Sequence, residues 1–346
     1  MASSVQNNRV SSPGYCVCCR TCNMWCWRAF KWLPVLLIVS IITWSYYAYV
    51  IQLCIFTIES TVQQCIYLVL YHILLIMFSW SYWRTIFAEI QPIPDKFKLP
   101  EAELEKLLSA ESEDSQRTIL DNFAKELPIV TRTMSGSVRY CNRCVLVKPD
   151  RAHHCSICAR CVLKMDHHCP WVNNCVCFYN YKFFMLFLGY ALFYCLFIMA
   201  TCLPYFIKFW KGDFGTAASA GRYHIVFAFF VALMFAISLG SLFGYHCYLV
   251  INNRTTLEAF RAPMFRGGTD KNGFSIGAFN NFKEVFGNSP NLWIVPVFTS
   301  FGDGIVYPVP NQEEESESLL SSERWERWGE RARPFDERES SSFDEL

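Results

Sequence analysis

The sequence lacks a net charge that could attract a polyanion. Its 346 residues include 31 Lys and Arg and 30 Asp and Glu, for a formal net charge of +1. A chain so balanced has no overall attraction to nucleic acid, and we expect no nucleic-acid partner. The sequence also shows no cleavable signal peptide, so its 18 cysteines are expected to face a reducing compartment.

Charge is nearly absent from four long segments, which predicts four transmembrane helices. The chain is 53% hydrophobic and 17% aromatic, which makes it more apolar than a soluble domain. Segments 33–56, 62–83, 183–209 and 223–251 are each long enough to cross about 30 Å of hydrocarbon. A channel or transporter is disfavoured, because ion pathways inside membranes need charged groups within the spans.

The basic residues predict which side of the bilayer each loop faces. The loop between the first two spans has no Lys or Arg, whereas Arg20, Arg28, Lys31 and Arg84 flank these spans on the other side. The positive-inside bias therefore places the amino terminus, and the region between the second and third spans, in the cytosol.

The stretch from Tyr140 to Tyr181 contains eight of the 18 cysteines and four of the 7 histidines. It has no long apolar run, so it cannot build much of a core by itself. C-x2-C spacing lets two thiolates point at one ion, and Cys/His tetrahedra are what zinc prefers. Bound zinc would supply the missing folding energy. Two tetrahedral sites need about eight ligands, and the spacing alone leaves open which of the twelve candidates bind metal.

A second chemistry is visible inside this stretch at Asp166, His167 and Cys169. A carboxylate, an imidazole and a thiol so close together form the acid, base and nucleophile of thiol catalysis. A structural zinc knuckle has no use for the carboxylate. We therefore interpret Cys169 as the free nucleophile, His167 as its base, and Asp166 as the group that fixes the imidazole tautomer.

The run from Asp166 to Cys175, DHHCPWVNNC, resembles the signature of the DHHC protein S-acyltransferases, or palmitoyltransferases. The cysteine-rich domain of that family is matched across the whole stretch. The resemblance implies an all-α integral membrane protein with four transmembrane helices and a cytosolic, zinc-stapled domain between the second and third. It implies two structural Zn²⁺ ions, one held by Cys141, Cys144, His154 and Cys161, the other by Cys155, Cys158, His168 and Cys175.

The match to the family has one departure, which lies just after Cys175. Cys177 stands where the family usually has Gly, and Tyr179 stands where Ser is common. If the usual Gly serves a positive backbone angle, Cys177 would strain the turn. It could also compete for metal, although we expect the replacement to be tolerated.

The expected organisation follows from the spans and the resemblance. It comprises a cytosolic cysteine-rich amino terminus (1–31), transmembrane helices 1 and 2 (32–83), a cytosolic connector (84–138), the DHHC zinc domain (139–182), transmembrane helices 3 and 4 (183–251), a cytosolic carboxy-terminal region (252–310) and a disordered acidic tail (311–346). Apolar periodicity over 101–127 predicts one or two short connector helices at the membrane surface.

Two short motifs of the family follow the last span. Thr255, Thr256 and Glu258 resemble its TTxE motif and could hold the zinc domain against the membrane, although an ordinary helix-capping box is the alternative. Asn281 resembles the buried Asn of its carboxy-terminal motif, and would tie loop backbone to helix ends.

The resemblance implies that a long-chain acyl group passes from palmitoyl-CoA, or another long-chain acyl-CoA, to cytosolic cysteines of membrane proteins through an acyl-Cys169 intermediate. Burial of a sixteen-carbon tail is worth roughly 10 kcal/mol or more, so the lipid bilayer region is where the tail is expected. The resemblance places the tail among all four helices. The implied lining residues are Trp44, Ser45, Phe184, Phe187 and Tyr194. Candidate contacts for the CoA phosphates, or equally for anionic lipid, are Arg139, Arg143, Lys148, Arg151 and Lys182.

A non-catalytic, membrane-anchored zinc adaptor is the rival hypothesis, because it needs the metal ligands but neither Asp166 nor Cys169. The expected compartment is the Golgi membrane, with plasma membrane and endosome as alternatives. Juxtamembrane cysteines at 16, 18, 19, 22 and 26 are typical of S-acylation. Residues 315–320 match an acidic dileucine sorting signal.

Overall fold

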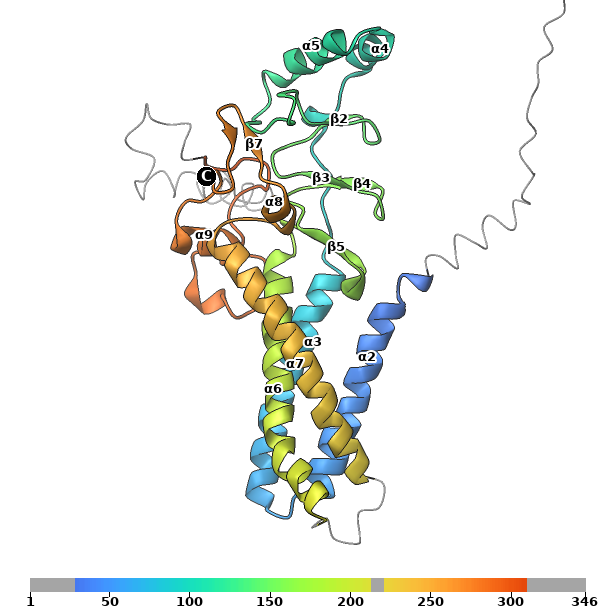
Figure 1. Cartoon of the computed structure of the whole chain (residues 1–346), viewed down its shortest axis with the longest axis vertical. Helices are drawn as coiled ribbons and strands as arrows, with labels where there is room; N and C mark the ends of the chain where they lie inside the picture. The colour runs from blue at the N-terminus through green and yellow to red at the C-terminus, as the bar shows by residue number, and fades with distance from the viewer. Residues whose placement is uncertain (1–28, 213–220, 310–346) are drawn as a thin grey trace, which may run out of the picture.

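The computed structural model describes residues 29–212 and 221–309. The amino-terminal cysteines, the dileucine-like sequence and the acidic tail lie outside these residues. Four apolar helices are long enough to cross a membrane, and Figure 1 shows them side by side, with the rest of the described chain gathered at one end. The expected four-helix membrane fold is confirmed.

The first span consists of α2 (Leu33–Tyr46), which continues as the π-helix η1 (Tyr47–Ile55). The other three are α3 (Thr61–Ile86), α6 (Tyr181–Lys211) and α7 (Gly221–Ile251). The ends have local causes: Pro34 lies in the first turn of α2, the Ser60 side chain accepts the Gln63 N–H to cap α3, and Gly212, with φ of 76°, ends α6. Helix α6 packs against both α3 and α7, so it forms the centre of the bundle.

The cysteine-rich domain consists of three antiparallel β-hairpins. They pair β1 (Tyr140–Cys141) with β2 (Leu146–Val147), β3 (His153–Cys155) with β4 (Arg160–Val162), and β5 (His167–Cys169) with β6 (Asn174–Val176). In Figure 1 the three hairpins are stacked, and β5 is the one nearest the membrane helices. The residues that carry the DHHC signature therefore lie where the domain meets the spans.

The connector forms η2 (Asp95–Phe97), α4 (Glu101–Ser109) and α5 (Glu113–Ala124). The prediction of short helices here agrees with the structure, but their expected position at the membrane surface was wrong. Figure 1 shows α4 and α5 at the end of the molecule farthest from the spans. The reason is a separate apolar cluster in which Phe97 and Leu107 pack with Val147 of the first hairpin, away from the bilayer.

The carboxy-terminal region wraps around the hairpins. It contains α8 (Thr256–Phe260), β7 (Met264–Phe265) paired with β8 (Gly268–Thr269), α9 (Ala278–Phe286) and the short helix η4 (Pro290–Leu292). Helix α9 packs against α6 and α7, and α8 lies next to the hairpins in Figure 1. This region therefore joins the cysteine-rich domain to the membrane helices.

Candidate active site

The hairpins bring together two groups of metal-binding side chains. Cys141, Cys144, His154 and Cys161 form one group, and all their donor atoms lie within 4.8 Å of one another. His154 Nδ1 is 3.6 Å from the sulfur of Cys141, 3.3 Å from that of Cys144 and 3.8 Å from that of Cys161. Tetrahedral zinc with ordinary bond lengths separates a nitrogen and a sulfur ligand by about 3.5 Å, so the residues present fit such an ion.

The second group has the same composition and the same geometry. It contains Cys155, Cys158, His168 and Cys175, again within 4.8 Å of one another. His168 Nδ1 is 3.7, 3.4 and 3.6 Å from the sulfurs, and the Sγ atoms of Cys158 and Cys175 are 3.5 Å apart. Because every cysteine in the described residues is free of disulfides, all six thiols are available to metal.

The third hairpin has the shape of a zinc knuckle without its second thiol. Cys141, Cys155 and Cys169 recur every fourteen residues at equivalent places in the hairpins. Each is followed four residues later by a residue in the left-handed region, at φ of 53°, 53° and 46°. The first two hairpins place a cysteine three residues after the first, but the third has Val172 there. Cys169 is therefore left outside both metal groups, and this repeat was the signal that sequence reasoning missed.

Asp166 and His167 form a closely bonded pair beside that cysteine. His167 Nδ1 is 2.6 Å from Asp166 Oδ2, and Thr256 donates its backbone N–H and its hydroxyl to the same carboxylate at 2.8 and 2.7 Å. Asp166 is only 1% exposed. Burial opposes charge on this carboxyl, but the hydrogen bonds from His167 and Thr256 outweigh it and lower the pKa of Asp166.

The imidazole of His167 is correspondingly favoured in its charged form. Burial disfavours the imidazolium, but hydrogen bonds to Asp166 and to Cys169 raise the pKa of His167 to about 9. The ring also meets Phe184 of α6 edge-on, with centroids 5.5 Å apart. Since Nδ1 faces Asp166, Nε2 is the nitrogen directed at the thiol.

Cys169 lies at the boundary between the hairpins and the spans. It is 7% exposed, and it belongs to the same apolar cluster as the buried residues of the four helices. The turn that follows it, η3 (Pro170–Val172), is held to α3 because Tyr82 donates its hydroxyl to the Trp171 carbonyl at 2.7 Å. Asn174 adds bonds to the carbonyls of Ile86 and Ala88, both at 3.1 Å. The sulfur is thus fixed at the end of the helix bundle.

Comparisons with known proteins identify the family of this chain. Residues 135–262 match the model of the family described as DHHC palmitoyltransferase. The chain is 56% identical over 283 residues to palmitoyltransferase ZDHHC2 of Danio rerio, which covers 82% of this chain and 78% of that protein. It is 48% identical over 317 residues to palmitoyltransferase ZDHHC15 of Mus musculus, which covers 91% and 94%. The chain belongs to the DHHC palmitoyltransferase family. The family and the enzyme class expected from the sequence are thereby confirmed.

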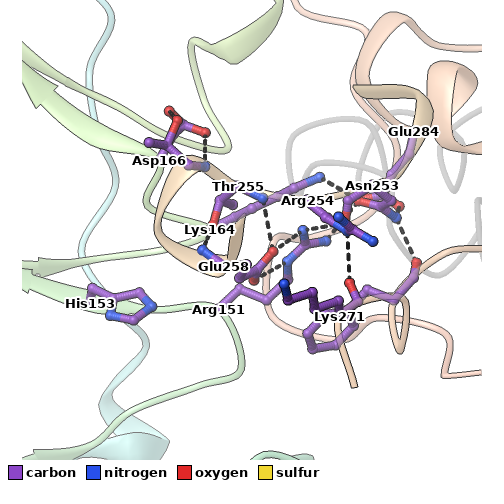
Figure 2. Close-up of polar contacts among 12 residues, drawn as sticks. Arg151, His153, Lys164, Asp166, Asn253, Arg254, Thr255, Glu258, Lys271 and Glu284 are labelled. Atoms are coloured by element: carbon purple, nitrogen blue, oxygen red, sulfur yellow. Dashed lines mark hydrogen bonds and ion pairs between the residues drawn. The ribbon is translucent and has the colours of Figure 1, made fainter. Parts of the chain in front are cut away.

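In this DHHC enzyme, the TTxE residues are both a capping box and a bridge between domains. The Thr255 side chain accepts the Glu258 N–H, and the Glu258 carboxylate accepts the Thr255 N–H, so both halves of a capping box are present. The same Glu258 binds Arg151 of the zinc domain with two bonds of 2.9 and 2.7 Å (Figure 2). Thr256 reaches Asp166, as described above. The two hypotheses for this motif are therefore compatible.

Arg151 and Lys182 are not available to phosphates, so their prediction as CoA contacts was wrong. The Arg151 side chain is 0% exposed, and its remaining donors bind the Asn253 side chain and carbonyl at 2.9 Å each. Lys182 is buried and donates to the Leu292 carbonyl and Thr299 hydroxyl at 2.8 and 2.7 Å. Sequence alone gives no sign of these partners, because they lie about a hundred residues away.

The three remaining motif positions are Asn281, Cys177 and Tyr179, and each has identifiable neighbours in the structure. Asn281, in α9, donates to the Ile251 carbonyl at 2.6 Å and accepts the Ile276 N–H at 2.9 Å, which ties the end of α7 to the loop before α9. Cys177 does not have a positive φ, so it does not strain the turn. It is fully buried outside both metal groups, and burial raises the pKa of its thiol to about 12. Tyr179 lies beside it, partly buried, and packs on Phe178.

An apolar cavity opens between the four spans of the enzyme. Trp44, Ser45, Phe187 and Tyr194 line it, together with residues of α3 and α7 such as Phe78 and Ala228. Phe184 does not line this cavity, and its ring instead contacts His167. The Tyr194 hydroxyl lies 2.7 Å from the hydroxyls of both Ser45 and Tyr71, so a buried polar cluster lies at the wall of this cavity.

Proposed function

We propose that this protein transfers a long-chain acyl group from acyl-CoA to cytosolic cysteine thiols of membrane proteins, with Cys169 carrying the acyl group in between. The observation that carries the proposal is the position of one sulfur atom. Cys169 lies outside both metal groups, two residues from the bonded His167–Asp166 pair, and in the apolar cluster of the spans. A thiol so placed can meet a reactive thioester whose tail lies in the membrane.

The reaction proceeds by double displacement. With the Cys169 proton held on His167, whose charged form is favoured, the thiolate attacks the thioester carbon, and CoA leaves with the proton from His167. In the second half, His167 takes the proton of a substrate thiol, whose sulfur attacks the acyl-enzyme and displaces Cys169. Asp166 keeps the imidazole in the tautomer that directs Nε2 at sulfur and stabilises the imidazolium in both halves.

Zinc in the two Cys₃His groups would be structural. Four protein ligands close a tetrahedral ion, so no coordination position remains for substrate. We expect two zinc ions per purified chain, and one fewer in Cys144→Ser, because that variant removes one of four ligands from a single site. Metal analysis after desalting checks this, with Ser156→Ala in the second knuckle as a variant that should retain both ions. Two ions retained in Cys144→Ser would contradict this ligand set.

The acyl tail is proposed to occupy the cavity between the spans. Tyr194 is thirteen residues into α6, so it lies about 20 Å along the helix from its cytosolic end, comparable to an extended sixteen-carbon chain. The Ser45–Tyr194–Tyr71 cluster would therefore meet the end of the tail.

Side-chain size at this cluster is expected to set the preferred acyl length. Ser45→Phe should favour shorter chains and Tyr194→Ala longer ones, each by about tenfold in relative rate, since one or two unburied methylenes are worth about 1–2 kcal/mol. Competition among acyl-CoAs of several lengths on purified protein measures this. Phe193→Ala, at an exposed neighbouring position on α6, is the matched control. If neither Ser45→Phe nor Tyr194→Ala changes the preference among acyl-CoA lengths, the cluster does not set acyl length.

A basic cavity of about 390 Å³ is the proposed site for the CoA headgroup. It is lined by Arg139, Lys148, His153 and Arg261, and we call it the headgroup cavity. Its one acid, Glu258, is already paired with Arg151. The cavity runs along α8, whose first residue contacts Asp166, and this contact supports the headgroup cavity as the phosphate site.

The active site is proposed to face the cytosol, in the Golgi membrane, with plasma membrane or endosome as the other compartments. The Lys and Arg distribution around the first two spans supports the orientation. Cysteine thiolates and two Cys₃His groups also require a reducing side.

The proposal is tested by trapping the covalent intermediate. Purified protein mixed with an alkynyl palmitoyl-CoA should acquire one hydroxylamine-sensitive label, which mass spectrometry should place on Cys169. Added thiol acceptor should then remove it. The zinc-adaptor alternative requires that no such label form.

A further inference from the structure

A third cavity, which adjoins the headgroup cavity, lies at the membrane-distal end of the molecule. Its volume is about 550 Å³, and residues at the end of α5 and in the β7–β8 hairpin line it. Figure 1 shows where α5 and β7 lie in the molecule. We call it the distal groove and define it by Lys125, Leu127, Arg132, Met264, Phe265 and Arg266. Its floor is apolar and its rim is basic, which suits a segment with both acids and apolar side chains.

The cations of the distal groove have no acid to balance them. Within residues 29–212 and 221–309, Lys125, Arg132 and Arg266 form no ion pair. The one acid that lines the groove, Asp121, is 3.7 Å from Arg117 on the same helix. Lys125 and Arg266 are exposed at the rim. An incoming acidic chain would therefore meet positive charge that no carboxylate of the described residues neutralises.

The chain itself carries such a segment close to the groove. Residues 313–320 read EEESESLL, four acids followed by two leucines, and we call them the acidic segment. Tyr307 packs on Phe274 with ring centroids 5.8 Å apart, and Phe274 packs on Phe265 of the groove at 5.2 Å. Glu313 is six residues beyond Tyr307, a reach of up to about 20 Å. The acidic segment can therefore reach the groove on its own chain.

We propose that the acidic segment docks in the distal groove, with its glutamates on the basic rim and Leu319 and Leu320 on the apolar floor. The groove shares Arg132, Met134 and Met264 with the headgroup cavity. A docked tail therefore places negative charge next to the site that the CoA phosphates need, and it competes with acyl-CoA. This competition, unlike the docking, rests on the headgroup site proposed above.

The size of the effect follows from tethering. A short linker gives an effective concentration of about 1 mM. A peptide site of even about 100 μM affinity would then be occupied roughly ten times as often as it is free. Removal of the tail should lower the apparent KM for acyl-CoA by about tenfold, with kcat unchanged.

The docking is tested by hydrogen exchange on the full chain and on two truncations. A chain that ends at residue 310 should exchange about tenfold faster than the full chain in residues 119–134 and 264–269. A chain that ends at residue 322 is the matched control, and it should exchange like the full chain because it keeps the acidic segment. Equal exchange in all three would overturn the docking. Binding of other acidic peptides but not of peptide 311–322 would assign the groove to a separate partner protein, and so also overturn it.

Charge-reversal variants distinguish a loss of docking from a loss of the fold. Lys125→Glu with Arg266→Glu should reproduce the effect of truncation on exchange and on KM, since neither residue lines the headgroup cavity. Glu313→Lys with Glu314→Lys in the same chain should restore both. Faster exchange without a change of KM would overturn the competition. Failure of the catalytic proposal is distinguishable, because Cys169→Ser would leave the exchange pattern of the full chain intact.

Discussion

Replacement of Cys169 by serine is expected to abolish acyl transfer while the protein stays folded. The transferred acyl group would lose the sulfur that is proposed to carry it, and a serine hydroxyl beside His167 is a far weaker nucleophile than a thiolate. Transfer from palmitoyl-CoA to a cysteine peptide should fall by at least about 10⁴-fold, as for removal of a nucleophile in other covalent enzymes. Because Cys169 belongs to neither metal group, the zinc content should remain that of the unaltered chain.

Cys177→Ser is the control for this result. Cys177 lies eight residues away in the same domain, and it is likewise buried and outside both metal groups. It lacks the imidazole partner, and burial holds the pKa of its thiol near 12, so it should carry no acyl group. This variant should keep the label and most of the activity. If a hydroxylamine-sensitive label persists in Cys169→Ser, another residue is the nucleophile. If the unaltered chain acquires no label, the result favours the zinc-adaptor hypothesis.

Short-range patterns in the sequence accounted for much of the site. The four spans could be predicted because each is a long apolar run. The zinc ligands could be narrowed down because C-x2-C spacing limits where two thiols can point. Adjacency alone placed Asp166 next to His167, and the structure shows them bonded at 2.6 Å. In each case the interacting groups are close in sequence, so local geometry determines the contact.

Contacts between residues far apart in the sequence could not be predicted from the sequence. Arg151 looked like a phosphate ligand because an isolated Arg usually faces solvent. Its partner Glu258 is 107 residues away, and only the packing of α8 against the second hairpin brings them together. The position of α4 and α5 was missed for the same reason, since charged short helices suit the membrane surface and the distal apolar cluster equally. Phe184 points at His167 rather than into the cavity because helix rotation within the bundle is set by packing, not by sequence spacing.

The Arg151–Glu258 pair leads to the second large prediction. Glu258→Ala should destabilise the protein by about 3–5 kcal/mol, because it leaves the Arg151 charge buried without its bidentate carboxylate. Glu284 cannot fully replace that carboxylate, since it lies 3.8 Å from Arg151 and is bonded to Lys164 at 2.6 Å. The midpoint of thermal unfolding in detergent should fall by about 10 °C. Activity should fall as well, because α8 presents Thr256 to Asp166.

Two further variants test why Glu258→Ala loses stability. The cause is either the unpaired buried charge of Arg151 or the absence of the ion pair that joins Arg151 to Glu258. Asp95→Ala breaks the Lys98–Asp95 pair, which has the same 2.7 Å separation but side chains 56% and 88% exposed, and it should cost less than about 1 kcal/mol. Arg151→Leu combined with Glu258→Leu removes both buried charges and should recover much of the stability lost in Glu258→Ala. If that double variant stays folded yet transfers acyl groups slowly, the pair serves to position α8, and through it the carboxylate that orients His167. If it unfolds as readily as Glu258→Ala, the ion pair itself holds the zinc domain to the carboxy-terminal region.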